Sequence, residues 1–224
     1  MRRMMDLIGA AICLVLVSPI LAATTIAIWI RDGRPIFFRQ QRIGRFGRPF
    51  TVFKFRSMRI NNLPLDDVSE IRKGHPLVTG VGNFIRRYKI DELPQLFNVL
   101  IGDMSLIGPR PTIIEQVMHY SAFQWRRLEV RPGLTGWGQV NGGIDISWPD
   151  RIMLDVWYVD HQSFWLDVQI YLRTIQVVLL GERSDELRLE QARTYAAKQA
   201  DRTESVSQRV GFNPASDLCQ AGRD

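Results

Sequence analysis

Two adjacent carboxylates and several arginines are the residues of this chain whose types and spacing suggest chemistry. Asp91 and Glu92 stand side by side at the expected start of a helix. One carboxylate of such a pair can attack phosphorus while the other holds a divalent cation, and Mg²⁺ takes only one or two protein carboxylates. The alternative interpretation is structural, because an aspartate at this position often only caps a helix.

Basic residues surround this pair in the sequence. Arg86 and Arg87 precede it, and Arg110 lies between two prolines that stiffen its backbone. Arginines and helix N-termini both bind phosphate groups, so the pattern indicates phosphoryl transfer. The sequence contains no P-loop, no His-Glu-x-x-His pair and no Gly-x-Ser-x-Gly elbow. Their absence excludes the commonest types of nucleotide hydrolase, metalloprotease and esterase.

Composition and charge predict an anionic partner. The 224 residues are 46% hydrophobic and carry a formal net charge of +6, which fits nucleic acid, a phospholipid surface or a phosphorylated substrate. We expect no nucleic-acid partner, because no recognition motif is present and the cations follow an apolar segment. Two cysteines provide neither a disulfide framework nor a zinc site.

The apolar segment is long enough to enter a membrane. Residues 7–30 carry no charge, and a helix needs about 20 apolar residues to cross a bilayer. A secretory signal is the first alternative, but the apolar character continues past Ala22-Ala23, where a cleavage site would end it. Ser18-Pro19 in the middle predicts a bend, because Pro19 removes a backbone donor that Ser18 can help to replace.

Positive charge flanks both ends of this segment. Arg2 and Arg3 precede it, and residues 31–60 hold nine basic residues and one acidic residue. Positive flanks prefer the cytoplasmic side, so a broken helix that enters and leaves by the same face satisfies both. A helix that spans the membrane stays open, since proline also occurs in such helices.

The remaining sequence predicts an α+β fold that is mainly helical. We expect a hairpin from residues 35–43 and 50–56 around a turn at 44–47, in which Lys54 and Arg56 share a face, and a loop over 60–80. Residues 163–180 form an amphipathic pattern, typical of a membrane-interface helix or of a core-facing helix. Further helices are expected over 81–88, 91–100 with Asp91 as its N-cap, 113–127 and 150–159, and a turn-rich connection over 131–136.

Several motifs, in order along residues 2 to about 180, resemble those of the bacterial sugar transferases, the monotopic polyprenyl-phosphate phosphoglycosyl transferases. They are Arg2-Arg3-x-x-Asp6, Ser18-Pro19, Gln41-Arg42-Ile43-Gly44, Lys54-Phe55-Arg56-Ser57-Met58, Asp91-Glu92-Leu93-Pro94-Gln95, the run over 102–111 and Arg131-Pro132-Gly133-Leu134-Thr135-Gly136.

The resemblance implies a two-step reaction. Asp91 would attack the sugar-bearing phosphate of a nucleotide diphosphate sugar, usually a UDP-sugar, and release the nucleoside monophosphate; undecaprenyl phosphate would then accept the phosphosugar. Glu92 would bind Mg²⁺. The cations implied at the phosphates or lipid head groups are Arg86 and Arg110, with Lys54, Arg56 and Arg131.

The resemblance also implies the organisation of the chain. Residues 1–34 would form a re-entrant membrane anchor broken at Ser18 and Pro19. Residues 35–181 would form a small cytoplasmic α/β catalytic domain with amphipathic interfacial helices. Residues 182–224 lie beyond the resemblance, and their seven basic and eight acidic residues predict a polar tail. The protein would lie among membrane lipids on the cytoplasmic face of the bacterial inner membrane, as a minimal catalytic unit without a further N-terminal domain. A homodimer stays open.

Two positions depart from the pattern of the family. Leu77 and Gly143 stand where many members carry a charged residue, so neither the sugar nor the polysaccharide follows from the resemblance. The remaining alternative is a membrane-anchored basic scaffold or anion-binding protein, in which Asp91 only caps a helix and replacing it changes no activity.

Overall fold

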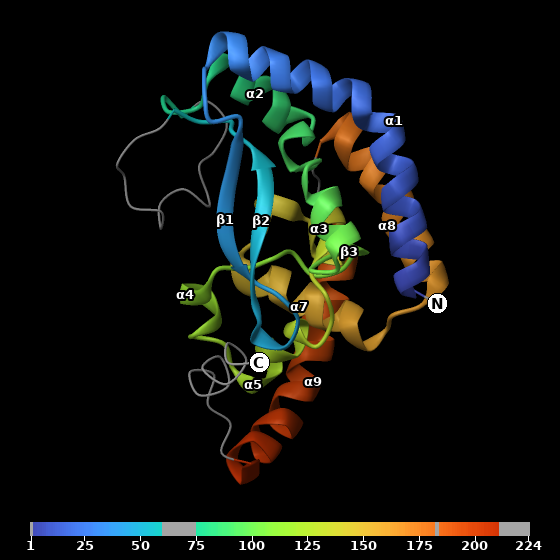
Figure 1. Ribbon diagram of the computed structural model, residues 1–224. Coiled ribbons are helices and arrows are strands. Elements are labelled where there is room, and N and C mark those ends of the chain that lie inside the picture. Colours follow the sequence, from blue (N-terminus) through green and yellow to red (C-terminus); the bar gives the residue numbers. More distant parts are fainter. Residues whose placement is uncertain (1, 60–74, 182–183, 211–224) are drawn as a thin grey trace.

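The computed structural model describes residues 2–59, 75–181 and 184–210. It is mainly helical with two small sheets, which confirms the α+β class (Figure 1). The helices are α1 (Arg2–Arg31), α2 (Gly80–Arg87), α3 (Gln95–Ile101), α4 (Ile114–Val117), α5 (Ala122–Trp125), α6 (Trp137–Val140), α7 (Trp148–Asp160), α8 (Phe164–Leu180) and α9 (Glu186–Val210). The strands are β1 (Phe37–Ile43), β2 (Pro49–Phe55), β3 (Ser105–Ile107) and β4 (Gly133–Thr135), and single 3₁₀ turns are η1 (Arg45–Gly47), η3 (Ile90–Glu92), η4 (Arg126–Leu128) and η5 (Gly143–Asp145).

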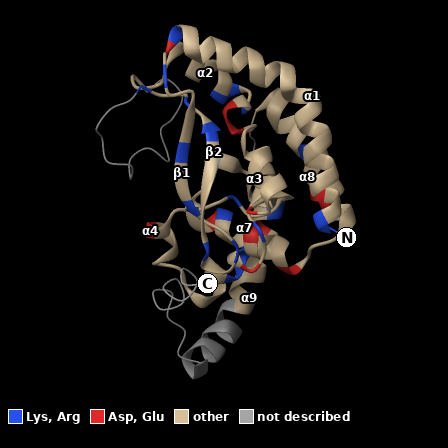
Figure 2. Cartoon of the chain, viewed as in Figure 1, with Lys and Arg blue, Asp and Glu red and all other residues tan. Residues whose placement is uncertain are grey.

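Helix α1 is long and apolar enough to cross a membrane by length and composition. It bends midway, so that its two halves run in different directions over the rest of the molecule (Figure 1). Along its length the side chains are uncharged except near the two ends (Figure 2). Pro19 lies inside the helix and has no N–H for the carbonyl of Val15, four residues earlier. The Ser18 hydroxyl donates to that carbonyl at 2.8 Å and replaces the missing donor.

The first turn of α1 is fixed to the domain by polar contacts. Arg3 donates to the carbonyls of Val99 and Leu100 at the end of α3, at 2.6 and 3.0 Å. The buried Asp6 accepts from the Ser105 hydroxyl at 2.8 Å and from the Leu106 N–H at 3.0 Å, on β3. The N-terminal charges therefore dock α1 on the two elements that bracket residues 102–104.

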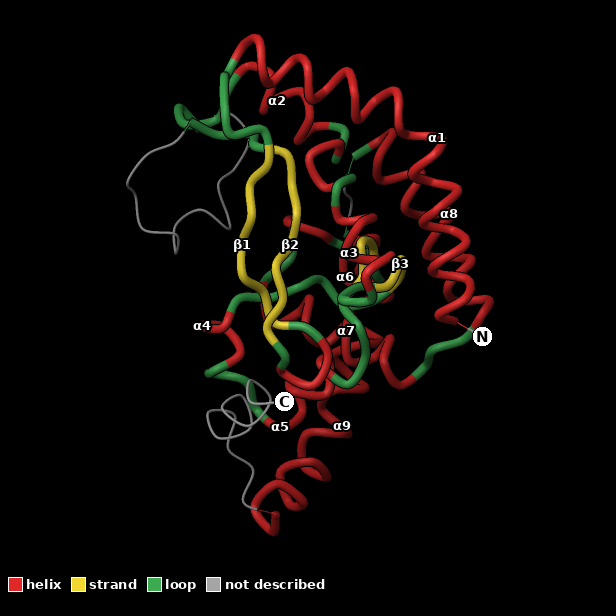
Figure 3. The backbone as a smooth tube through the Cα atoms, viewed as in Figure 1, coloured by secondary structure: helices red, strands yellow, loops and turns green. Residues whose placement is uncertain are grey.

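The predicted hairpin is confirmed (Figure 3). Its register is regular from Phe37 opposite Phe55 to Ile43 opposite Pro49. Alternation places Arg42, Val52 and Lys54 on one face. At the far end Phe55 is buried with Ile28 of α1 and Ile85 of α2, so this end of the hairpin packs against both helices.

The expectation of a turn-rich connection over 131–136 is wrong. Residues 133–135 form β4, which pairs in parallel with β3. Glycines permit the contact: a Cβ on Gly133 would lie 2.0 Å from the nitrogen of Gly108, and one on Gly136 would lie 2.0 Å from the oxygen of Gly108. The two backbones approach so closely that no larger residue fits between them.

A continuous helix over 113–127 is also wrong, because the chain breaks between α4 and α5. Ser121 starts a new helix with a capping box, in which its hydroxyl accepts from the Gln124 N–H and the Gln124 side chain accepts from the Ser121 N–H. The Ser-x-x-Gln spacing carries this signal in the sequence.

Helices α2 and α7 confirm the expectations for 81–88 and 150–159, and α8 that for 163–180. Leu166 and Ile170 of α8 are buried in the main core, whereas Trp165 and Leu179 are exposed. One face of α8 therefore packs against the core, and apolar residues on another face are exposed. An ion pair of 3.2 Å between Arg2 and Asp167 joins the starts of α1 and α8.

Residues beyond 181 form a packed helix over part of their length. Leu189, Ala192 and Ala196 of α9 are buried against the core clusters. Arg126, Asp160 and Tyr195 form a polar cluster between α9 and the end of α7. The division of the chain into domains at residues 34 and 181 stays a prediction. Residues 211–224 of the expected tail lie outside the described residues, and so does most of the loop expected over 60–80.

Candidate active site

The carboxylate pair lies on the 3₁₀ turn η3, between α2 and α3. Lys89 enters the turn with a φ of 57°, and α3 begins only after Pro94. Asp91 therefore does not cap α3, which corrects the expectation of an N-cap. Pro94 occupies the N-cap of α3, where its missing N–H costs no intrahelical hydrogen bond. Capping of α3 therefore does not account for Asp91.

Glu92 is held between two cations. Lys54 Nζ and Arg110 Nη2 both lie 2.8 Å from its Oε1 atom, and only 8% of the residue is exposed. Burial opposes ionisation, but the attraction of Arg110 and Lys54 outweighs it and holds the pKa of Glu92 well below its usual range. Glu92 is thus a permanent anion, and its Oε2 atom has only a 3.5 Å contact with Arg110 Nη1.

Asp91 differs from its neighbour. It is half-buried, and burial together with the charge of Glu92 raises its pKa to about 6. The positive charges of Lys54, Arg86 and Lys89 oppose this shift. A carboxylate with such a pKa is largely ionised at neutral pH and retains more basicity than an ordinary aspartate, which suits a nucleophile.

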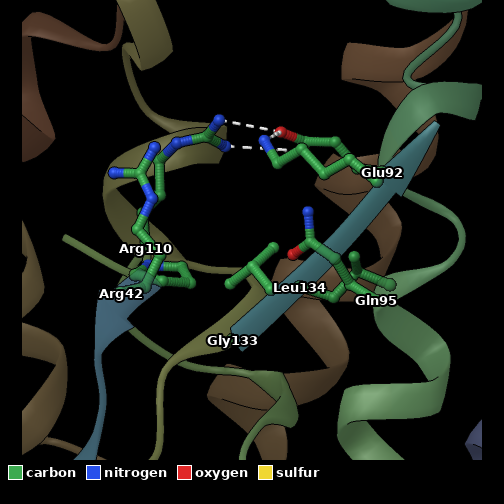
Figure 4. A pocket seen from close by; sticks show the side chains of 9 residues that line it. Arg42, Glu92, Gln95, Arg110, Gly133 and Leu134 are labelled. Atoms are coloured by element: carbon green, nitrogen blue, oxygen red, sulfur yellow. Dashed lines mark hydrogen bonds and ion pairs between the residues drawn. The ribbon is translucent and has the colours of Figure 1, made fainter. Parts of the chain in front are cut away.

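Next to the pair is a small pocket that is partly open to solvent. Figure 4 shows Arg42 and Arg110 side by side, across the pocket from Glu92. The lining comes from the hairpin face, the start of α3, the loop after β3, and β4: Arg42, Val52, Lys54, Glu92, Gln95, Arg110, Pro111, Gly133 and Leu134. Asp91 borders this pocket through its neighbour and is not among the lining residues.

The structure brings together Asp91, Glu92, Lys54 and Arg110, with Arg86 close enough to lower the pKa of Asp91. Arg42 and Gln95 were not predicted as site residues. The signal for Arg42 was its position on the same hairpin face as Lys54, which strand alternation could have revealed.

Arg56 and Arg131 do not line the pocket. Arg56 is buried and donates to the carbonyls of Asp32 and Gly33, just beyond the end of α1, at 2.5 and 2.8 Å. Arg131 donates to the carbonyl of Gly102, at the end of α3, at 2.9 Å. Both arginines bind backbone carbonyls of residues that directly follow a helix. Leu77 and Gly143, which depart from the family pattern, also do not line the pocket. Gly143 has a φ of 52°, a backbone conformation that favours glycine.

The donors available to a metal are oxygens. Within the described ranges no group of three or more His, Cys, Asp or Glu side chains gathers around a common point. A cation that binds by one or two carboxylates and completes its shell with substrate oxygens and water still fits, and this is the habit of Mg²⁺. Oε2 of Glu92 and the Asp91 carboxylate are the oxygens that it would use.

Comparison with known proteins adds the family. The family model described as bacterial sugar transferase matches residues 1–181. An uncharacterized sugar transferase of Bacillus subtilis (strain 168) is 43% identical over 182 residues, which cover 81% of this chain and 89% of the relative. The UDP-N-acetylgalactosamine-undecaprenyl-phosphate N-acetylgalactosaminephosphotransferase of Aeromonas hydrophila is 42% identical, over 80% of this chain and 44% of its own length.

The undecaprenyl-phosphate galactose phosphotransferase of Salmonella typhimurium is 38% identical over 80% of this chain and 40% of the relative. The chain therefore spans most of the Bacillus relative and less than half of the other two. The family match covers α1 through α8 and ends before α9. On this match over four fifths of its length, the protein belongs to the bacterial sugar transferase family.

Proposed function

We propose that the protein transfers a sugar 1-phosphate from a UDP-sugar to undecaprenyl phosphate and releases UMP. This is the first membrane step in the synthesis of an exopolysaccharide, a capsule or an O-antigen. The observation that carries the proposal is Asp91, a carboxylate with a pKa of about 6 beside a pocket that holds three cations. The relatives named for undecaprenyl-phosphate sugar phosphotransfer support the two substrates.

The proposed first step forms a bond between a carboxylate oxygen of Asp91 and the phosphorus that bears the sugar. The bond from that phosphorus to the bridging oxygen breaks, and UMP leaves with the oxygen and its electrons. In the second step an oxygen of undecaprenyl phosphate attacks the same phosphorus, and the bond to Asp91 breaks. Lys54, Arg110 and Arg86 offset the negative charge of the Asp91 carboxylate and of the substrate phosphates around the reacting phosphorus.

We include Mg²⁺ in this proposal. Glu92 would hold the ion through Oε2, because Oε1 is already shared by Lys54 and Arg110. When bound, Mg²⁺ would supply charge neutralisation at phosphate oxygens. Lys54 and Arg110 keep Glu92 ionised and fix its orientation whether or not the ion is present.

We further propose that α1 is re-entrant, with both ends on the cytoplasmic face of the bacterial inner membrane. The bend at Pro19 and the arginines at both ends of the helix support this topology. Single cysteines in place of Arg3 and Arg34, in a background without Cys13 and Cys219, test it. A membrane-impermeant thiol reagent should label both only from the cytoplasmic side, whereas a spanning helix exposes one on each side.

Release of UMP is the decisive measurement. Detergent-solubilised protein is incubated with undecaprenyl phosphate, Mg²⁺ and UDP-glucose, UDP-galactose or UDP-N-acetylgalactosamine. We expect Asp91→Asn to abolish UMP release while folding and membrane association persist. Glu190→Gln, which removes an exposed carboxylate on α9, is the matched control and should retain activity. Release of UDP in place of UMP would overturn the mechanism, and a silent Asp91→Asn would favour a non-catalytic scaffold.

A further inference from the structure

The pocket beside Glu92 holds more positive charge than its own carboxylate balances. Lys54 and Arg110 share Glu92, while the third cation, Arg42, has no carboxylate within 4 Å in the described part of the chain. Its hydrogen bond goes to a neutral group, from Nη2 to Gln40 Oε1 at 2.7 Å. Burial and the neighbouring charge of Arg110 lower the pKa of Arg42 to about 10. The attraction of Glu92 and Glu115 opposes this shift, and an incoming anion would add to that attraction.

The position of Arg42 indicates which anion it receives. In the hairpin, Lys54 stands opposite Phe38, near the end that packs on α1 and α2. Arg42 follows four residues later on β1, about 13 Å further along the strand at a rise of about 3.3 Å per residue. The N–H of the adjacent Ile43 donates to the carbonyl of Thr112 at 2.8 Å, and this end of β1 lies away from α2 and the end of α1 (Figure 1). The two ends of the site therefore face different surroundings.

The two proposed substrates arrive from opposite sides. A polyprenyl chain stays in the bilayer, so its phosphate approaches from the side of α1 and α2. A water-soluble nucleotide sugar has no such constraint and can occupy the end of the pocket remote from them. At that end of the pocket, Arg42 is the lining cation that does not pair with Glu92.

We propose that Arg42 binds the phosphate of the donor that leaves within the nucleoside monophosphate, and that it does not contact the phosphate of the lipid. The inference rests on the proposed function and deepens it, because it divides the cations of the site between the two substrates. Arg110 and Lys54 then bind the reacting phosphate beside Glu92, and Arg42 binds the phosphate of the leaving group.

Binding measured without turnover tests this division. The thermal unfolding midpoint of the detergent-solubilised full chain is recorded with UMP, with inorganic phosphate and with undecaprenyl phosphate. We expect Arg42→Gln to weaken UMP binding about 10- to 100-fold, as for a lost charge-assisted contact, and to leave the response to the lipid unchanged. The KM for the UDP-sugar should rise by a similar factor without a change in the KM for undecaprenyl phosphate.

Arg39→Gln is the matched control, because Arg39 lies on the same strand with its side chain on the other face, over the Phe53 ring. It should bind both ligands as the wild type does. Arg42→Lys keeps the charge but not the planar fork and should bind UMP with intermediate affinity. Lipid binding that persists in each variant shows that the variant is folded.

Other outcomes separate the two proposals. Loss of the lipid response with normal UMP binding, or unchanged binding of both, would overturn the role of Arg42. Equal losses for UMP and inorganic phosphate with the lipid response intact would support it. Wild-type protein that binds UMP through Arg42 yet releases no UMP from any UDP-sugar would contradict the proposed function alone.

Discussion

Arg127 donates a hydrogen bond from Nη2 to the backbone carbonyl of Arg110, at 2.9 Å. Only 1% of Arg127 is exposed, and its other partners are Asp155 Oδ2 and the Tyr120 hydroxyl, each at 2.6 Å. A buried guanidinium needs such partners to keep its charge. Asp155 thereby holds Arg127 in place, and Arg127 fixes the backbone from which Arg110 reaches Glu92.

Removal of the charge of Asp155 should destabilise the fold. Asp155→Asn leaves Arg127 as a buried cation without its counter-ion, which costs about 3–5 kcal/mol in comparable cases. Chemical denaturation of the detergent-solubilised protein measures this loss. Asp145→Asn, at an exposed position, should change the free energy of unfolding by less than about 0.5 kcal/mol. Similar stability of the two variants would show that the pair contributes little.

Replacement of both partners separates stability from positioning. Arg127→Met with Asp155→Leu removes the buried pair together, so most of the stability lost in Asp155→Asn should return. The carbonyl of Arg110 nevertheless loses its donor, and we expect kcat/KM for UMP release to fall about 10- to 100-fold, the scale of a small misplacement in an active site. A stable double variant with full activity would exclude a positioning role for Arg127.

Activity should fall on the acid side near pH 6. In the proposed mechanism Asp91 attacks as the anion. Burial together with the charge of Glu92 raises its pKa to about 6, so the reactive fraction decreases tenfold for each pH unit well below that value. The profile of kcat/KM against pH measures this limb. An ordinary aspartate would keep the rate constant down to about pH 4.

The same profile for Glu92→Gln tests the cause. Loss of the neighbouring charge removes one contribution that raises the pKa of Asp91, so the acid limb should move to lower pH even though the maximal rate falls. An acid limb that stays at pH 6 would assign the shift to burial alone.

Helix α9 should contribute to stability although it lies beyond the family match. Leu189 is 2% exposed in the main core, whereas Leu187, two residues earlier, is 79% exposed. Leu189→Ala should lower the free energy of unfolding by about 2–5 kcal/mol, and Leu187→Ala by less than about 0.5 kcal/mol. Equal effects on the unfolding midpoint would mean that α9 does not pack as described.

The bend of α1 leads to a paired prediction. Ser18→Ala leaves the carbonyl of Val15 without a donor. In the membrane environment proposed for α1, this should cost about 1–3 kcal/mol. Addition of Pro19→Ala restores a backbone N–H for that carbonyl and should recover stability while it straightens the helix. The unfolding midpoint measures stability, and thiol labelling at the two ends measures topology. A single variant as stable as the wild type would contradict the role of Ser18.

Elements with a local signal were predictable from the sequence. The hairpin follows from alternation on both sides of a Gly-rich turn, and α7 and α8 from their apolar periodicity. The parallel pair of β3 and β4 was not predictable in this way, because each strand has three residues and their partners lie far apart in the chain. The break before Ser121 had a local signal in its capping box, which the apolar pattern over 113–127 concealed.

The site shows a similar division. Residue type and spacing identified the carboxylate pair, and Lys54 and Arg110 meet Glu92. Arginines were assigned less well, because the same guanidinium can bind a phosphate or the carbonyls at the end of a helix. Arg56 and Arg131 bind carbonyls, whereas Arg42 faces the pocket. The sequence shows the donor, and only the fold shows which acceptor it meets.

Both ends of α1 are tied to the domain that carries Asp91. Arg3 and Asp6 hold the first turn on α3 and β3, and Arg56 holds the carbonyls just beyond the last turn. A helix clamped at both ends cannot act as a flexible tether, so with α1 in the membrane as proposed, the Asp91 carboxylate stays at one height above the membrane surface. Encounter with a lipid carrier then becomes a search in two dimensions, set by how fast carriers diffuse laterally and not by any swing of the domain.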